Sequence, residues 1–86
     1  MLQEQTSVTR QVSVMQIKQL LSKQINIPPD EISTTANFSR YGLNSISAVT
    51  LAGELEDLYA ITIDPTLLLD YDTIEKLFEY IKTQIN

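Results

Sequence analysis

The sequence predicts an all-α fold, a four-helix bundle with three main helices and a short third helix. Three observations support this prediction. Apolar residues recur at intervals of three and four positions in three separate segments, no segment alternates between apolar and polar residues as a β-strand would, and prolines and capping residues separate the segments. With 86 residues, the chain is long enough for one small domain with a single core.

The first main helix is expected from about Arg10 to Ile25. Its apolar stripe consists of Val14, Ile17, Leu21 and Ile25. Asn26 can end this helix because Asn tolerates the left-handed conformation, and Pro28-Pro29 prevents its continuation. The following segment, from Ile27 to Asn44, is expected to be a long loop that carries function or a short helical turn. Its anchors in the core are predicted to be Ile32, Phe38 and Leu43.

The second main helix is expected to begin at Asn44 or Ser45 and to run to about Tyr59. Asn44 is a good N-cap, because its side-chain oxygen can accept one of the free N–H groups of the first turn. When the residues are placed at steps of about 100°, one face collects the predicted core stripe. This stripe consists of Ala48, Leu51, Ala52, Leu55, Leu58 and Tyr59.

A short helical turn opened by Pro65 is expected over residues 65–69, after a connector with buried isoleucines. The last main helix is expected from about Thr73 to Ile85. Its buried face contains Ile74, Leu77, Phe78, Ile81 and Ile85. Asp72 and Glu75 have the spacing of a capping box, which predicts that Asp72 caps this helix.

The composition excludes several classes of function. The chain has no cysteine and no histidine, which removes disulfides, thiolate nucleophiles, Ser-His-Asp triads and the common zinc sites. Carboxylate pairs such as Asp70 and Asp72 are interpreted as solvated or capping groups, since a bundle of this size rarely encloses the pocket that acid–base catalysis needs. We therefore expect no catalytic residues, no metal site and no enzymatic activity.

The net charge of −5 disfavours binding to nucleic acids and to anionic membranes. Residues 1–44 carry four basic and three acidic side chains, whereas residues 45–86 carry two basic and eight acidic ones. A partner of the second half is therefore expected to be basic.

No apolar run is long enough for a membrane span, and the first residues do not resemble a signal peptide, so a soluble cytoplasmic protein is expected. Residues 1–8 are expected to be a flexible N-terminus and residues 9–86 to form the domain. A free-standing chain is favoured over one excised from a larger protein. A monomer is expected, because no long apolar seam remains for self-association.

The second helix has apolar residues that the core does not explain. Ile46 lies opposite the core stripe, and Val49 lies about 60° from Ile46 around the helix. The same outer sector contains or adjoins Ser45, Thr50, Gly53 and Asp57. Exposed apolar residues beside an N-terminal serine favour a docking surface. The alternative is that Ile46 and Val49 contact the long first loop and belong to the core.

Residues 38–49 resemble the attachment segment of acyl carrier proteins, in which the pattern F-x-x-x-G-x-D-S-L precedes a helix. In this chain the segment reads Phe38-Ser39-Arg40-Tyr41-Gly42-Leu43-Asn44-Ser45-Ile46-Ser47-Ala48-Val49. Residues 66–77 resemble the region between the third and fourth helices of carriers in modular polyketide synthases. The similarity in spacing runs from about Val14 to Ile85, nearly the whole chain.

The resemblance implies a carrier rather than a catalyst. In this family a phosphopantetheinyl transferase moves 4′-phosphopantetheine from coenzyme A onto the motif serine, which here is Ser45. The thiol of this arm then holds an acyl or polyketide intermediate as a thioester, which accords with the absence of cysteine. The implied role is to shuttle intermediates between acyl-transferring and condensing enzymes in polyketide or specialised fatty-acid biosynthesis, as a phosphoprotein of lipid metabolism. The alternative for Ser45 is an ordinary serine of the first helical turn.

The residues expected to contact partners are Asn44, Ile46, Val49, Glu54 and Asp57. The family usually has Asp before the serine. Asn44 keeps the capping role but lacks the charge that would face a basic transferase surface. Ser47 and Thr50 also occupy positions where bacterial fatty-acid carriers often have acids. A broad-specificity transferase is therefore the expected partner, rather than one that recognises early acidic contacts.

Two other functions stay open. A peptidyl or aminoacyl carrier of nonribosomal synthesis would share the arm and differ in the group it holds. An unmodified helical interaction module would keep the fold without the arm. The only observation that supports it is Asn44, which stands where the family usually has Asp.

Overall fold

The structure, a computed structural model, describes residues 11–85 of the chain. Its elements in chain order are α1 (Val14–Ile25), the 3₁₀ turns η1 (Pro29–Glu31) and η2 (Phe38–Tyr41), α2 (Ser45–Tyr59), α3 (Leu67–Asp70) and α4 (Ile74–Ile85). The predicted all-α bundle with a short third helix is confirmed, and residues 11–85 contain no strand.

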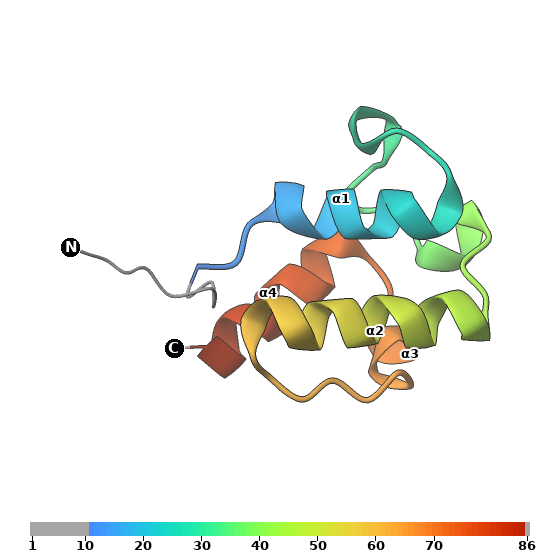
Figure 1. Cartoon of the computed structure of the whole chain (residues 1–86). Helices are drawn as coiled ribbons and strands as arrows, with labels where there is room; N and C mark the ends of the chain where they lie inside the picture. Colours follow the sequence, from blue (N-terminus) through green and yellow to red (C-terminus); the bar gives the residue numbers. More distant parts are fainter. Residues whose placement is uncertain (1–10, 86) are drawn as a thin grey trace.

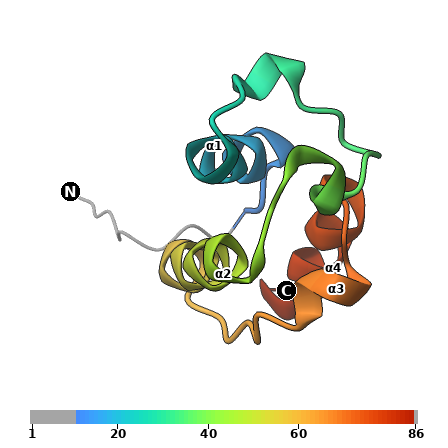
Figure 2. The same cartoon turned by 90° about the vertical axis from the view of Figure 1, so that its right-hand side faces the viewer.

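The three long helices surround one interior. α1 and α2 lie side by side and run in opposite directions, and α4 is inclined to both (Figure 1). The end-on view shows α1, α2 and α4 around the core, with α3 next to α4 (Figure 2). α1 packs against both α2 and α4. The segment between α1 and α2 closes one end of the bundle, and η2 lies in this segment just before α2.

The core receives apolar side chains from all four helices and from the connecting segments. It consists of Ile17, Leu21, Ile32, Phe38, Leu51, Ala52, Leu55, Tyr59, Ile63, Leu68, Ile74, Leu77 and Ile81. The predicted loop anchors Ile32 and Phe38 are buried, and Leu43 packs half-buried against the core. Because apolar residues of the loop are buried with the helices, the loop is fixed relative to α2.

α1 begins four residues later than the sequence analysis predicted. Residues 11–13 are not helical, and Ser13 has an extended backbone whose hydroxyl accepts the N–H of Met15 at 3.2 Å. Ser13 is therefore the N-cap, a position that serine favours because its hydroxyl satisfies a free N–H group. Asn26 ends the helix in the left-handed conformation, as predicted (φ 58°, ψ 38°). Arg10 and the predicted flexible residues 1–8 lie outside the described residues.

The predicted capping box at the start of α4 is wrong. The hydroxyl of Thr73 accepts the N–H of Lys76 at 3.1 Å, so Thr73 caps the helix. Asp72 instead accepts hydrogen bonds from Asn37 and Lys76. The capping residue is thus one position later than predicted, and this leaves the carboxylate of Asp72 available for a tertiary contact.

Candidate functional site

A tight turn directs the chain from η2 into α2. Gly42 has a left-handed backbone with φ +83° and ψ 18°, and its N–H bonds back to the carbonyl oxygen of Ser39 at 3.1 Å. The N–H of Leu43 bonds to the carbonyl oxygen of Phe38 at 3.3 Å. No neighbouring atom lies within 4 Å of the place that a β-carbon of Gly42 would take. The backbone conformation therefore explains the glycine, and a close approach of another segment does not.

Asn44 caps α2 as predicted. Its side-chain oxygen accepts the N–H of Ser47 at 2.8 Å, and its carbonyl oxygen accepts the N–H of Ala48 at 2.8 Å. Ser45 is consequently the first residue of the helix, and it is exposed. A group attached to its hydroxyl would lie beside the first turn, where free N–H groups and the helix dipole favour negative charge.

Hydrogen bonds to residues far along the chain hold the segment that leads into this turn. The side-chain amide of Asn37 donates to the carboxylate of Asp72 at 2.6 Å, and the N–H of Phe38 donates to the carbonyl oxygen of Asp72 at 2.8 Å. Further back, the N–H of Glu75 donates to the carbonyl oxygen of Thr34 at 3.0 Å. The position of Ser45 therefore depends on contacts between the first loop and the start of α4.

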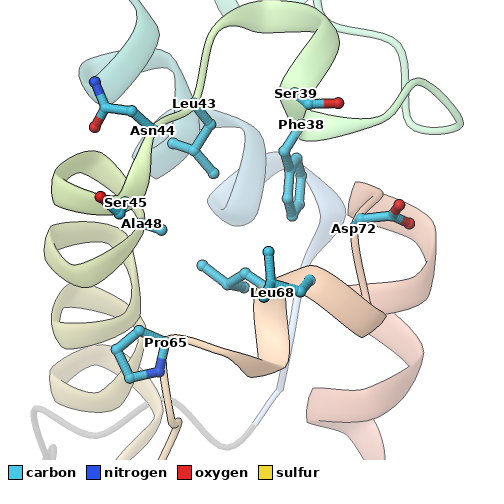
Figure 3. Close-up of a pocket in the computed structure, with 10 residues that line it drawn as sticks. Phe38, Ser39, Leu43, Asn44, Ser45, Ala48, Pro65, Leu68 and Asp72 are labelled. Atoms are coloured by element: carbon cyan, nitrogen blue, oxygen red, sulfur yellow. The ribbon is translucent and has the colours of Figure 1, made fainter.

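An apolar pocket of about 230 Å³ lies beside Ser45. Its lining comes from η2, the turn that follows η2, the start of α2, the connector before α3, α3 itself and the segment between α3 and α4. The lining residues are Phe38, Ser39, Leu43, Asn44, Ser45, Ala48, Pro65, Leu68, Leu69 and Asp72. Phe38, Leu43 and Leu68 point into the pocket, whereas Asn44 and the carboxylate of Asp72 point away from it (Figure 3). The pocket thus offers an apolar interior next to a hydroxyl that faces solvent.

α3 contributes a site residue that the sequence analysis did not identify. Of its three leucines, Leu68 is buried and Leu67 is half-buried, while Leu69 is 77% exposed and lines the pocket. The run of three leucines in a helix of four residues was an available signal, since one turn cannot bury all of its faces. Asp64 holds the start of this turn by accepting the N–H and the hydroxyl of Thr66, and these bonds lower the pKa of Asp64.

The outer face of α2 is apolar at its N-terminal end. Ile46 is 78% exposed and Val49 is 56% exposed, so the alternative that they contact the first loop as core residues is wrong. Asp57 is also exposed, nearer the C-terminal end of the helix. Exposed apolar residues therefore follow Ser45 on α2, at Ile46 and Val49, and Leu69 adds another on α3, where it lines the same pocket as Ser45.

Glu54 lies apart from the other predicted partner contacts. Its carboxylate is 3.4 Å from the ammonium group of Lys23 on α1, and one of its oxygens is buried without a hydrogen-bond partner among the described residues. Glu56 is engaged as well, because it accepts the N–H of Ile63 at 2.7 Å. Within residues 11–85, Asp57 is the one acid of α2 that makes no ion pair or side-chain hydrogen bond.

The described residues support neither a metal site nor a membrane span. Residues 11–85 contain no group of three or more acidic side chains placed to hold a metal ion. None of their helices is both long and apolar enough to cross a membrane. The chemical features of the site are therefore an exposed hydroxyl, an apolar pocket and an exposed apolar face.

The comparisons with known proteins agree with these features. The family model described as "Phosphopantetheine attachment site" matches residues 16–81. Polyketide synthase PksM of Bacillus subtilis is 35% identical over 63 residues, which are 73% of this chain and 2% of that protein. The chain spans 1% to 4% of the length of the curated relatives it matches, so it corresponds to one small part of each.

Two solved structures share the fold. A free-standing peptidyl carrier protein from an uncharacterised secondary metabolic pathway of Acinetobacter baumannii is 38% identical, with a TM-score of 0.82. The match covers 85% of this chain and 91% of that one. The HMG-ACPI domain of the CurA module from Lyngbya majuscula is 28% identical, with a TM-score of 0.78, and the match covers 96% of this chain and 88% of that one.

Proposed function

Because this chain belongs to the family of phosphopantetheine attachment domains, we propose that Ser45 is its attachment residue and that the protein carries acyl or polyketide intermediates as thioesters. The prosthetic group of the family is 4′-phosphopantetheine, and its members are carriers without catalysis of their own. The observation that supports the assignment is the exposed hydroxyl of Ser45 at the first position of α2, beside an apolar pocket.

The proposed attachment is a phosphoryl-group transfer onto the serine hydroxyl. The oxygen of Ser45 forms a bond to the phosphorus next to pantetheine in coenzyme A. The bond between that phosphorus and the oxygen bridging the two phosphates breaks, and adenosine 3′,5′-bisphosphate leaves. The hydroxyl proton passes to a base supplied by the transferase or solvent. The chain contributes an accessible nucleophile and no catalytic group.

The residues around Ser45 fit such an arm. The bond from Ser47 to Asn44 fixes the first turn, and the free N–H groups of that turn favour the negative charge of a phosphodiester. The apolar pocket adjoins the same residue and offers surface to uncharged parts of the arm or its cargo. The bound group would supply the thiol, which the chain, having no cysteine, does not provide.

The proposed partners are a phosphopantetheinyl transferase of broad specificity and the acyl-transferring and condensing enzymes of a synthase. They would approach a docking face that consists of Ile46, Val49, Asp57 and Leu69. Apolar contacts dominate this face, and Asp57 offers one charge for a basic group of a partner. Glu54 is left out of it, since its carboxylate faces Lys23 of α1.

The cargo is proposed to be an acyl or polyketide intermediate, because the curated relatives include polyketide synthases. One observation favours a second candidate, a peptidyl carrier. The Acinetobacter baumannii protein with that name is 38% identical and is matched over nearly its whole length. The two candidates share the arm at Ser45 and differ in the enzymes that load it and remove its cargo.

The test of the attachment residue is the intact mass of the protein after incubation with coenzyme A and a broad-specificity phosphopantetheinyl transferase. We expect the mass of one phosphopantetheine group to be added to the wild type and to Ser47→Ala, and nothing to be added to Ser45→Ala. Ser47 is the matched control, since it lies in the same helical turn. Addition to Ser45→Ala, or no addition to the wild type, would contradict the proposal.

The test of the cargo uses the modified protein loaded with an acyl group or with an aminoacyl group. A polyketide condensing enzyme and a nonribosomal condensation enzyme are each offered both forms. We expect turnover of the acyl form by the polyketide enzyme at a kcat/KM at least about tenfold above that of the other pairs. The reverse preference would replace the first candidate by the peptidyl carrier.

A further inference from the structure

Gly53 occupies a position on α2 that the fold does not explain. A glycine inside a helix is less favourable than alanine, because it loses more conformational freedom on folding. Among the described glycines a left-handed backbone is found at Gly42 and not at Gly53. No neighbouring atom lies within 4 Å of the place that a β-carbon of Gly53 would take. Neither backbone conformation nor internal packing therefore requires a glycine here.

The missing side chain lies on the outer face of the helix. Gly53 follows Ile46 by seven residues, which places it about 20° from Ile46 around the axis. Val49, one turn before it, and Asp57, one turn after it, are exposed. Gly53 itself is half-buried. We call this place on the docking face, where the side chain between Val49 and Asp57 is missing and the space is open, the notch.

We propose that this notch receives an apolar side chain of the phosphopantetheinyl transferase that modifies Ser45. The inference rests on the proposed function. It makes Gly53 a residue that determines whether the transferase can lie close against α2. A basic group of the transferase beside that side chain would reach Asp57, since the acids Glu54 and Glu56 are engaged within the domain.

The distance along the helix favours the transferase as the occupant. The α-carbon of Gly53 lies about 12 Å along the axis from that of Ser45. An interface of about 800 Å² on one partner has a radius of about 16 Å, so a transferase centred on Ser45 also covers Gly53. The transferase must hold the hydroxyl of Ser45 itself. Synthase enzymes act at the far end of a flexible arm and have more freedom in where they dock.

The experiment compares Gly53→Ala and Gly53→Leu with the wild type in thermal stability and in the rate of modification by coenzyme A and a broad-specificity transferase. Both substitutions should raise the Tm by roughly 2–6 °C, because they introduce better helix formers. The kcat/KM for modification should fall about threefold for Gly53→Ala and at least about tenfold for Gly53→Leu. A variant that is more stable and yet modified more slowly separates docking from folding.

Gln19→Ala, on the exposed face of α1, is the control for a helical surface substitution and should leave kcat/KM unchanged. An unchanged kcat/KM for modification of both Gly53 variants would contradict the proposed contact at the notch, and the proposed attachment at Ser45 would still stand. Slower transfer to a synthase enzyme with unchanged modification would also overturn the proposal and assign the notch to that enzyme. No modification of the wild type would instead contradict the proposed function itself.

Discussion

The side-chain amide of Asn37 donates a 2.6 Å hydrogen bond to the carboxylate of Asp72, which lies 35 positions later in the chain. This bond, together with the backbone bond from Phe38 to the carbonyl oxygen of Asp72, fastens the turn before Ser45 to the start of α4. Lys76, four residues after Asp72, forms an exposed ion pair with the same carboxylate at 3.2 Å. The two contacts of Asp72 should therefore differ in their contribution to stability.

Asn37→Ala should lower the free energy of unfolding by about 1 kcal/mol, because Asp72 loses a charge-assisted hydrogen bond that joins two parts of the fold. Lys76→Ala should change it by less than about 0.5 kcal/mol, since exposed i,i+4 ion pairs contribute little. Urea denaturation monitored by circular dichroism measures both values. An equal loss in the two variants would contradict the expected difference between the amide contact and the ion pair.

Gly42→Ala should destabilise the domain by about 1–2 kcal/mol, because alanine is disfavoured at φ +83°. There is open space for the added methyl group, so the cost is one of backbone conformation alone. Gly42→Asn should lower the free energy of unfolding by less than Gly42→Ala, because Asn tolerates the left-handed region. Chemical denaturation of the two variants side by side gives the comparison. A larger loss for Asn than for Ala would contradict this explanation.

Stability should fall in alkaline solution through Tyr59. Burial raises the pKa of this phenol above its ordinary value, and a hydrogen bond with the backbone of Ser13 offsets part of the rise. Because the folded pKa is higher than the unfolded one, the neutral phenol stabilises the fold fully below about pH 10. That stability is lost as the pH rises through the folded pKa.

Urea midpoints measured between about pH 8 and pH 11 should therefore decline more steeply for the wild type than for Tyr59→Phe. The variant should also be less stable at neutral pH by about 1 kcal/mol, since it lacks the 2.7 Å hydrogen bond that Tyr59 donates to Gln16. If the urea midpoints of the two proteins decline in parallel as the pH rises, Tyr59 is not the cause of the decline.

Ile46→Ala and Leu69→Ala should each reduce kcat/KM for modification of Ser45 by about fivefold to thirtyfold, as expected for apolar contacts at the centre of an interface. Both residues are more than three-quarters exposed, at 78% and 77%, so stability should change by less than about 0.5 kcal/mol. Met15→Ala is the matched control, because Met15 is an apolar residue of α1 that is 50% exposed. A similar loss for Met15→Ala would show that the effect is not confined to the docking face.

Asn44→Asp should keep the cap on Ser47 and stabilise the domain by about 0.3–1 kcal/mol at low salt, because a negative charge is favourable at a helix N-terminus. It should also raise the rate of modification by a transferase of the fatty-acid type, with little change for a broad-specificity one. Thermal denaturation and intact-mass time courses measure the two effects. Equal rates with both transferases before and after the substitution would contradict the role assigned to this position.

The sequence predicted the parts of the fold that depend on local spacing. The helices end at Ile25, Tyr59 and Ile85 as expected, because their apolar stripes end there. The cap of α2 at Asn44 was equally local, since donor and acceptor lie three residues apart. The errors at the starts of α1 and α4 have one cause. In both cases a serine or threonine that the sequence analysis did not identify caps the helix: Ser13 caps α1, for which no cap was predicted, and Thr73 caps α4 in place of its neighbour Asp72.

Contacts between distant segments could not be predicted in this way. The bond between Asn37 and Asp72 and the ion pair between Lys23 and Glu54 depend on how the helices pack, which helical periodicity does not specify. The exposure of Leu69 was missed for the same reason, as three adjacent leucines do not reveal which one faces the core. The motif around Ser45 predicts where the site lies, and the packing determines which residues surround Ser45.

The bond from the N–H of Ile63 to the carboxylate of Glu56 has a consequence for comparing carriers. Ile63 lies seven residues after Glu56, so this bond holds the connector against α2. The connector in turn leads to α3 and Leu69. If every acid of α2 is taken as a contact for partners when carriers are compared, Glu56 is assigned the wrong role. An acid at the position of Glu56 holds the connector that leads to α3. Partner choice should instead depend on an acid such as Asp57, which makes no ion pair or side-chain hydrogen bond within residues 11–85.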